Sequence, residues 1–158
     1  MSIEKVRAHF RTLGIENRIL EFGVSSATVE LAAAALNTQG KRIAKTLSFL
    51  VDEKAVLIVA AGDAKIDNRK FKDFFHTKAK MLSPEQVTTL VGHAIGGVCP
   101  FAVNEGVDVF LDESLKRFET VFPACGSSNS AIELTVPELE KYSGFKEWIN
   151  VTKLPQAE

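Results

Sequence analysis

The sequence predicts a mixed α/β fold in which helices pack around one mixed, curled β-sheet. Strand-like apolar segments outnumber helical ones and do not alternate strictly with long helices, which disfavours a doubly wound parallel sheet. The chain has 158 residues, the usual length of one domain, and 46% of them are hydrophobic, which is enough for a substantial core. We therefore expect a single domain over residues 1–158.

The first quarter of the chain predicts two helices with a short strand between them. Apolar residues recur at helical spacing from Ile3 to Leu13, and Gly14 can end that helix in a left-handed conformation. Residues 18–22 predict a short strand. An alanine-rich helix is expected over Val29–Leu36, with candidate caps at Ser25, Ser26 and Thr28.

The strongest strand signal is a hairpin of Ile43–Val51 and Ala55–Ala61 around the polar turn 52–54. The second strand is continuously apolar, which is typical of a central strand covered on both faces. Asp67 or Asn68 can cap the helix that follows.

Residues 78–82 predict another short strand, and a marked helix start comes directly after it. Ser83-Pro84-Glu85-Gln86 combines an N-cap serine, proline at the first helical position and the glutamine of a capping box. This helix should end at Gly92. Further along, we expect strands at 107–111, 120–124 and 131–136, helical segments at 112–118 and from Pro137, and fraying after Trp148.

Charge and cysteine content favour a soluble cytoplasmic protein. The net charge is −1 and no block of like charges occurs, so the chain as a whole has no electrostatic preference for nucleic acid, although a local basic rim on a small RNA contact stays possible. The two cysteines have no zinc-type spacing, no targeting segment is evident, and the apolar runs are too short to span a bilayer.

The stretch Gly92–Phe101 holds three glycines, a proline, His93 and Cys99. Cys99 and His93 are conceivable as a nucleophilic pair, but a cysteine among apolar residues is more often a small buried hydrophobe. The histidines and cysteines show no recurrent metal-ligand spacing; they are His9, His76, His93, Cys99 and Cys125.

Lys45 is the most informative charged residue. In a strand it shares a face with Ile43, Leu47 and Phe49, so it either faces a pocket or protects a sheet edge. Asp63 and Asp67 fit a strand-end turn and a helix cap. The small-residue loop 125–130 suits a phosphate or ribose as well as a solvated turn, and no nucleotide-binding glycine motif is present.

Four motifs occur in a specific order: Lys45-Thr46-Leu47, Gly62-Asp63 after an apolar strand, Gly96–Phe101, and Ala124-Cys125-Gly126. From about Thr28 to Val136 the chain thereby resembles the YbaK/EbsC family, the free-standing relatives of the editing domain inserted in bacterial prolyl-tRNA synthetases. The resemblance implies a curved, partly barrel-like mixed sheet surrounded by helices. It also implies hydrolysis of amino acids wrongly attached to tRNA, usually the tRNA for proline.

The same resemblance implies the roles of particular residues. Gly96, Gly97 and Pro100 belong to a G-x-x-x-P loop that shapes the aminoacyl pocket, and Lys45 meets the terminal phosphate of the tRNA or positions the ester. Substrate-binding positions are Thr28, Thr46, Asp63, Val98, Cys99, Phe101, Gly126 and Ser127. The loop after Gly126 departs from many relatives, which have an arginine or a second glycine where Ser127 stands.

The implied activity is trans-editing deacylation, needing no cofactor or metal. The 2′-hydroxyl of the terminal adenosine helps to activate water and backbone groups position it. The expected substrate is the tRNA for proline carrying Ala, Cys, Ser or Thr. A non-catalytic module that binds a tRNA end or an aminoacyl ligand is the alternative, and a hydrolase dependent on Cys99 is a weaker one. The implied partners are the acceptor end of a mischarged tRNA and an aminoacyl-tRNA synthetase, with no membrane contact.

Overall fold

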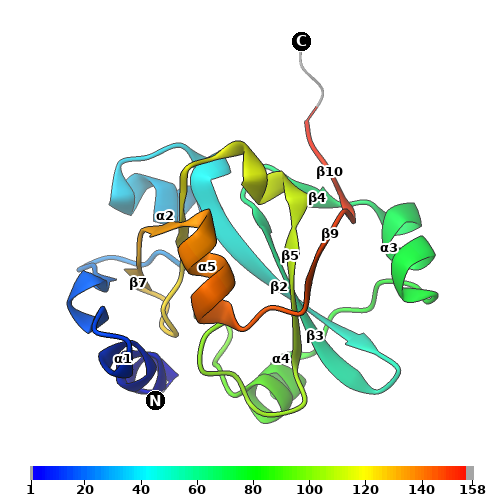
Figure 1. Cartoon of the computed structure of the whole chain (residues 1–158), viewed down its shortest axis with the longest axis horizontal. Helices are drawn as coiled ribbons and strands as arrows, with labels where there is room; N and C mark the ends of the chain where they lie inside the picture. Colours follow the sequence, from blue (N-terminus) through cyan, green and yellow to red (C-terminus); the bar gives the residue numbers. More distant parts are fainter. Residues whose placement is uncertain (1, 156–158) are drawn as a thin grey trace.

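A six-stranded mixed sheet forms the centre of the molecule (Figure 1). The computed structural model describes residues 2–155. The strand order is β8-β6-β2-β3-β5-β9, with antiparallel pairs β8–β6 and β2–β3 and parallel pairs elsewhere. The strands are β2 (Ile43–Val51), β3 (Lys54–Ala61), β5 (Asp108–Asp112), β6 (Thr120–Pro123), β8 (Leu134–Thr135) and β9 (Glu147–Ile149). The predicted mixed, curled sheet with surrounding helices is confirmed.

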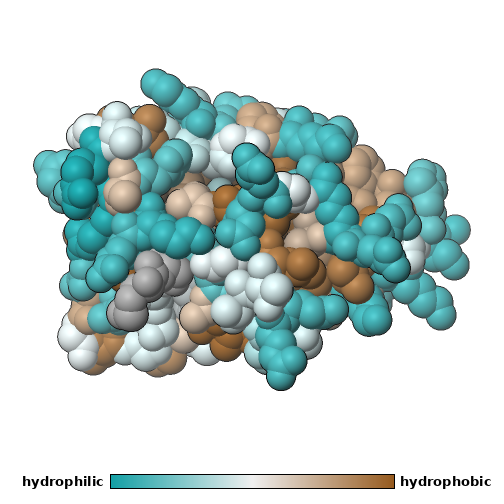
Figure 2. Space-filling model, turned by 90° about the horizontal axis from the view of Figure 1, so that it is seen from below, coloured by the Kyte–Doolittle hydropathy of each residue, from teal (hydrophilic) through white to brown (hydrophobic). Residues whose placement is uncertain are grey.

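Helices cover both faces of this sheet. The α-helices are α1 (Ser2–Thr12), α2 (Val29–Leu36), α3 (Asn68–Phe75), α4 (Pro84–Gln86) and α5 (Val136–Ser143). Short 3₁₀ segments are η1 (Glu16–Arg18), η2 (Gly40–Arg42) and η4 (Glu113–Arg117). Within residues 2–155, no helix has the length and apolar character needed to cross a membrane. On the face shown in Figure 2, hydrophilic side chains cover most of the surface and hydrophobic ones appear in patches between them.

Strand β3 separates two hydrophobic cores because its side chains alternate between the faces of the sheet. Leu57 and Val59 belong to the larger core, which also takes in α1 and α5. Val56 and Ile58 belong to a smaller core closed by Phe71 of α3. Every residue of β3 except Lys54 is buried, so the predicted central strand is confirmed.

The predicted helix starts are confirmed by their caps. Thr28 accepts the backbone N–H of Leu31 at the start of α2, and Asp67 caps α3. Ser83 and Gln86 form the predicted capping box at α4. The helix that follows changes to a π-helical segment, η3 (Val87–Val91), before Gly92 ends it with a φ of 93°.

Three predicted strands are shorter than expected. Residues 18–22 contribute only β1 (Leu20–Glu21), which pairs with β7 (Ser130–Ala131). The predicted strand 131–136 is divided in the structure between β7, which ends at Ala131, and β8, which begins at Leu134. The predicted strand 78–82 is reduced to a single antiparallel bridge, in which Met81 pairs with Phe49 of β2. These segments pair with distant partners whose positions local patterns do not indicate.

The expectation of fraying after Trp148 was wrong. Residues 147–149 form β9, and β10 (Thr152–Lys153) pairs with β4 (Lys65–Ile66). A buried carboxylate, that of Asp112, holds this segment. It accepts the N–H of Val151 at 3.0 Å and the hydroxyl of Thr152 at 2.7 Å.

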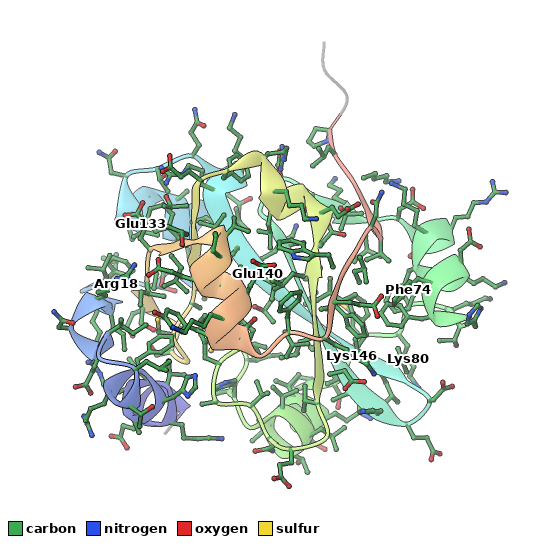
Figure 3. The ribbon with its side chains drawn as sticks, in the orientation of Figure 1. Arg18, Phe74, Lys80, Glu133, Glu140 and Lys146 are labelled. Carbon is green, nitrogen blue, oxygen red and sulfur yellow. The ribbon has the colours of Figure 1, made fainter. Side chains whose placement is uncertain are left out.

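A salt bridge joins the N-terminal part of the chain to α5. Arg18 donates to both carboxylate oxygens of Glu138, at 2.7 and 3.1 Å, and also to the carbonyl of Glu133. Figure 3 labels Arg18 and Glu133 on the same side of the molecule. The Arg18 guanidinium is the main reason why the pKa of Glu138 falls to about 2. A carboxylate whose pKa is lowered in the folded protein contributes its full stabilisation at pH values above its ordinary pKa. This stabilisation is lost as the pH falls through the lowered pKa.

We predict that Glu138→Gln lowers the free energy of unfolding at pH 7 by about 1 kcal/mol, because the pair is partly exposed. Glutamine keeps the capping box with Thr135, so the variant removes mainly the charge. The difference from wild type should shrink between about pH 4.5 and about pH 2, as measured by urea unfolding. Glu105→Gln on an exposed turn is the control, and an unchanged acid profile in Glu138→Gln would refute the assignment.

Candidate active site

The outer edge of β2 is paired at both ends but open in the middle. At one end, Ala44 pairs with Pro123 of β6. At the other end, Leu82 donates to the carbonyl of Ser48. Backbone groups of alternate residues point to the same edge of a strand, so the N–H and C=O of Thr46 also face this edge. The gap therefore exposes backbone donors and acceptors that a continuous sheet would cover.

A cavity of about 230 Å³ lies at this gap. Its walls come from β2, α2 and the segment before it, the segment around Met81, the Gly96 loop and the end of β6. The residues that line it are Ser26, Ala27, Thr28, Val29, Ala32, Ile43, Ala44, Lys45, Thr46, Ser48, Met81, Leu82, Val87, Ile95, Gly96, Val98, Phe122, Ala124, Ser130 and Ala131. Lys45 is the one ionisable side chain among them.

Lys45 is half-buried in the cavity wall, and its ammonium group is held at the end of β3. Nζ donates to the carbonyl of Gly62 at 3.3 Å and to the carbonyl of Ala64. Burial lowers the pKa of Lys45, while the nearby charge of Asp63 acts in the opposite direction. An ammonium group has three N–H donors, so one remains for a ligand in the cavity.

Thr46 presents a polar atom that the protein leaves unsatisfied. Its Oγ1 is buried and has no hydrogen-bond partner among the described residues. A buried hydroxyl without a partner costs roughly 1–3 kcal/mol of desolvation. Because side chains alternate along a strand, this hydroxyl lies on the face of β2 opposite to the Lys45 side chain, and the polar groups of Thr46 that face the gap are its backbone N–H and C=O.

The glycine-rich loop closes the opposite side by a close backbone approach. Gly96 has a φ of 90°, a left-handed conformation that favours glycine. A Cβ atom on Gly97 would lie 2.6 Å from the carbonyl carbon of Gly126 and 2.7 Å from the nitrogen of Ser127. The two loops that the resemblance assigns to the site are therefore in backbone contact, and Gly97 permits that contact.

His93 and Cys99 lie behind this loop, in the core. His93 Nε2 lies 2.7 Å from the carbonyl of Phe101, so this nitrogen must carry the proton. Cys99 Sγ lies 3.6 Å from the same nitrogen. Burial raises the pKa of the Cys99 thiol to about 12. A buried, protonated thiol cannot act as a nucleophile at neutral pH, so this geometry fits packing and disfavours the Cys–His alternative.

The late loop uses its polar groups mainly to hold itself against the segment before α2. Ser127 Oγ contacts the hydroxyl of Ser130 at 2.7 Å, and Asn129 donates to the carbonyl of Phe22. The carbonyl of Ser128 accepts the N–H of Ser26 at 2.6 Å. Of the two earlier interpretations of this loop, these contacts favour a structural role over an open phosphate site.

Asp63 lies outside the cavity lining, although it follows β3, the strand that pairs with the Lys45 strand β2. Its carboxylate forms a two-bond ion pair with Arg117, at 2.6 and 3.1 Å. The Arg117 hydrogen bond is the main reason why the pKa of Asp63 is lowered. At the neighbouring position 62 only glycine fits, because a Cβ atom there would lie 2.0 Å from the carbonyl oxygen of Gly40.

The cavity thus brings together five of the residues assigned from the sequence, which are Thr28, Lys45, Thr46, Gly96 and Val98. Outside the lining lie Asp63, Gly97, Cys99, Pro100, Phe101, Gly126 and Ser127. Sequence reasoning missed Ser48, although it shares a strand face with Thr46. It also missed Met81 and Ile95, and no local pattern marks either of them as a cavity residue.

We predict that Gly97→Ala destabilises the protein by about 2–4 kcal/mol, because its Cβ would collide with backbone that cannot move aside easily. Urea unfolding would measure the change. Gly23→Ala is the matched control, since a Cβ at Gly23 meets nothing within 4 Å, and it should stay within about 0.5 kcal/mol of wild type. Equal stability of both variants would show that the two loops are not in contact.

We predict that Thr46→Val raises the free energy of unfolding by about 1 kcal/mol, because it removes a buried hydroxyl that has no partner. Thr120→Val is the contrasting variant. Its hydroxyl donates to Glu133 at 2.7 Å, so the same substitution there should lower stability. A destabilised Thr46→Val protein would mean that the hydroxyl is already hydrogen-bonded in the free protein.

Comparison with known proteins places this geometry in a family. The family model of the aminoacyl-tRNA editing domain matches residues 24–142, which include all the cavity-lining residues. YwhH of Bacillus subtilis (strain 168), a protein described as uncharacterised, is 56% identical over 154 residues, covering 97% of this chain and 98% of that protein.

Two further comparisons link the fold to prolyl-tRNA synthetases. The proline–tRNA ligase of Bacillus cytotoxicus is 29% identical over 101 residues, 63% of this chain but only 18% of the ligase. A crystal structure described as that of a candidate trans-editing enzyme for prolyl tRNA synthetase superimposes with a TM-score of 0.85 and 27% identity, over 96% of this chain and 97% of the other. The resemblance drawn from the sequence is confirmed: the chain belongs to the aminoacyl-tRNA editing domain family.

Proposed function

We propose that this protein is a trans-editing deacylase that hydrolyses the ester of a mischarged tRNA, with the tRNA for proline carrying Ala, Cys, Ser or Thr as the expected substrate. The observation that carries the proposal is one cavity, at the gap in the pairing of β2, that is lined by Lys45, Thr46 and Gly96. The similarity to a proline–tRNA ligase and to a structure described as a candidate trans-editing enzyme for prolyl tRNA synthetase supports the choice of substrate class.

The size of the cavity fits the aminoacyl group rather than the whole terminal nucleotide. It encloses about 230 Å³, below the roughly 300–1,000 Å³ typical of pockets for drug-sized ligands. Branched apolar side chains such as Val29 and Ile43 narrow it, so bulky amino acids are excluded by sterics. Such a pocket discriminates by only about 1–3 kcal/mol per methylene, so several small amino acids should be accepted.

The lining residues also limit the chemistry. No histidine, cysteine or carboxylate lines the cavity among the described residues, so the protein offers no conventional general base there. In the proposed reaction, the substrate 2′-hydroxyl helps to activate water, whose oxygen attacks the ester carbonyl. The carbon–oxygen bond to the ribose breaks, and a proton passes to the ribose oxygen. Lys45 and the strand edge at Thr46 orient the ester and stabilise the developing negative charge.

The experiment that tests the proposal is a panel of tRNAs for proline charged with Ala, Cys, Ser, Thr or Pro, followed by release of the amino acid. Release of one or more small amino acids, with cognate Pro-tRNA left intact, is the expected result. Tight binding with hydrolysis of none would instead identify a binding module. If the protein neither binds nor hydrolyses any of these tRNAs, both the deacylase and the binding module are refuted.

We predict that Lys45→Met abolishes deacylation without lowering the melting temperature. Burial lowers the pKa of Lys45, so its charged form is disfavoured in the folded protein and removing the charge should not destabilise it. Lys41→Met on the exposed η2 turn is the control and should keep its activity. Wild-type rates in Lys45→Met would remove this lysine from the reaction.

A further inference from the structure

Positive charge is concentrated in one segment of a chain whose net charge is −1. Residues 65–80 contain six Lys or Arg side chains against two aspartates, a local charge of +4. The segment comprises β4, α3 and the stretch after it, on the side of the molecule where Phe74 and Lys80 lie in Figure 3. One of its two carboxylates, that of Asp67, is used to cap α3 by accepting the N–H groups of Arg69 and Lys70.

Two lysines of this region face each other across paired strands. Lys65 of β4 and Lys153 of β10 are register partners in the antiparallel pair, and both are exposed. Like charges directly opposite each other destabilise a sheet. Within residues 2–155, neither ammonium lies in a salt bridge with a carboxylate. The only offset to this repulsion that the described residues provide is the Asp67 carboxylate, whose pKa the charge of Lys153 helps to lower.

The pair is continuous with the candidate active site. Lys65 directly follows Ala64, whose carbonyl accepts a hydrogen bond from the Lys45 ammonium. The charge of Lys65 contributes, after burial, to the lowered pKa of Lys45, so the two ammonium groups are within electrostatic reach. Lys45, Lys65 and Lys153 are therefore neighbours in turn, the first two within electrostatic reach and the last two across paired strands.

Lys153 also lines a shallow groove of about 410 Å³, together with Lys70, Arg117 and Glu113, whose carboxylate pairs with Lys116 at 3.7 Å. Lys70 is fixed there by hydrogen bonds to Asn150 Oδ1 at 3.2 Å and to the carbonyl of Thr152 at 2.8 Å. The charge of Arg117 is offset by Asp63. Within residues 2–155, the Lys65 and Lys153 ammonium groups have neither a salt bridge nor a hydrogen bond to hold them, although the charge of Lys153 reaches the Asp67 carboxylate and helps to lower its pKa.

We propose that Lys65 and Lys153 bind phosphates of the single-stranded RNA end whose terminal ester enters the cavity beside Lys45. A single strand carries one phosphate per nucleotide, so a line of separated ammonium groups matches it better than one compact anion. Binding releases counterions and relieves the repulsion between the two lysines. The inference rests on the proposed function because it takes the editing substrate to be the bound RNA.

The test uses an uncharged RNA minihelix with the acceptor stem and single-stranded 3′ end of a tRNA for proline, labelled for fluorescence anisotropy. The Kd is measured between about 50 and about 200 mM salt for wild type, Lys65→Gln, Lys153→Gln and the double variant. Lys141→Gln on α5 is the matched control, because it removes one exposed positive charge elsewhere.

We predict that each lysine substitution weakens RNA binding about fivefold near 0.1 M salt and reduces the slope of log K against log salt by about 0.7, with about 1.4 for the double variant. Lys141→Gln should keep the wild-type slope. The melting temperatures of Lys65→Gln and Lys153→Gln should equal or exceed that of wild type, because a like-charge pair has been removed.

Several results would overturn the inference: no binding by wild type, an unchanged slope in the double variant, or an equal loss of slope in Lys141→Gln. Hydrolysis of mischarged tRNA by the same proteins separates this inference from the proposed function. Lysine-dependent RNA binding without hydrolysis would sustain the inference and refute the deacylase. Normal hydrolysis with a wild-type salt slope in the double variant would do the reverse.

Discussion

The candidate active site depends on an interruption in the pairing of β2. Its inner edge is fully bonded to β3, which fixes the strand rigidly along eight residue pairs. Its outer edge meets β6 at one end and the Met81 segment at the other, two pieces of chain that have no pairing with each other. The mismatch leaves Thr46 on an open edge in the middle of an otherwise rigid sheet. A site built on such a strand keeps its geometry when a ligand enters, which is what catalysis by positioning requires.

The features that mark the candidate site are unfavourable for the stability of the free protein. Lys45 is desolvated, Thr46 carries an unpaired buried hydroxyl, and Lys65 opposes Lys153 across two short strands. Each is unfavourable for the free protein, and a ligand with a carbonyl and several phosphates would relieve all three. Structural features such as the Asp112 network show the opposite pattern, because every contact there is satisfied within the protein. This contrast separates functional polar groups from structural ones without reference to any relative.

Local sequence patterns predicted those parts of the structure that are determined by residues close together in the chain. The hairpin, the caps of α2 and α4 and the strand face of Lys45 depend on residues a few positions apart, and all were placed correctly. The bridge of Met81 to β2 and the ordered β9 and β10 depend on partners far along the chain, and no local pattern indicated them. The glycine-rich loop lies between these cases. The resemblance assigned both Gly97 and Gly126 to the site, but only the fold shows that Gly126 is the backbone that Gly97 approaches.

On the proposed function, recognition of the substrate divides between two places on the protein. The cavity would take the aminoacyl group and separate substrates by size, which yields little discrimination among small side chains. It contains a single cation and buries too small a volume to hold an RNA chain, so it cannot supply the affinity for RNA. That affinity has to come from surface charge, and the overall charge of −1 means that the surface charge must be local. The proposed lysine pair, which begins one residue after the carbonyl that holds Lys45, would meet this requirement. In the proposed reaction, no histidine, cysteine or carboxylate is needed among the described residues that line the cavity, because the RNA end would be held outside and would bring its own reactive groups.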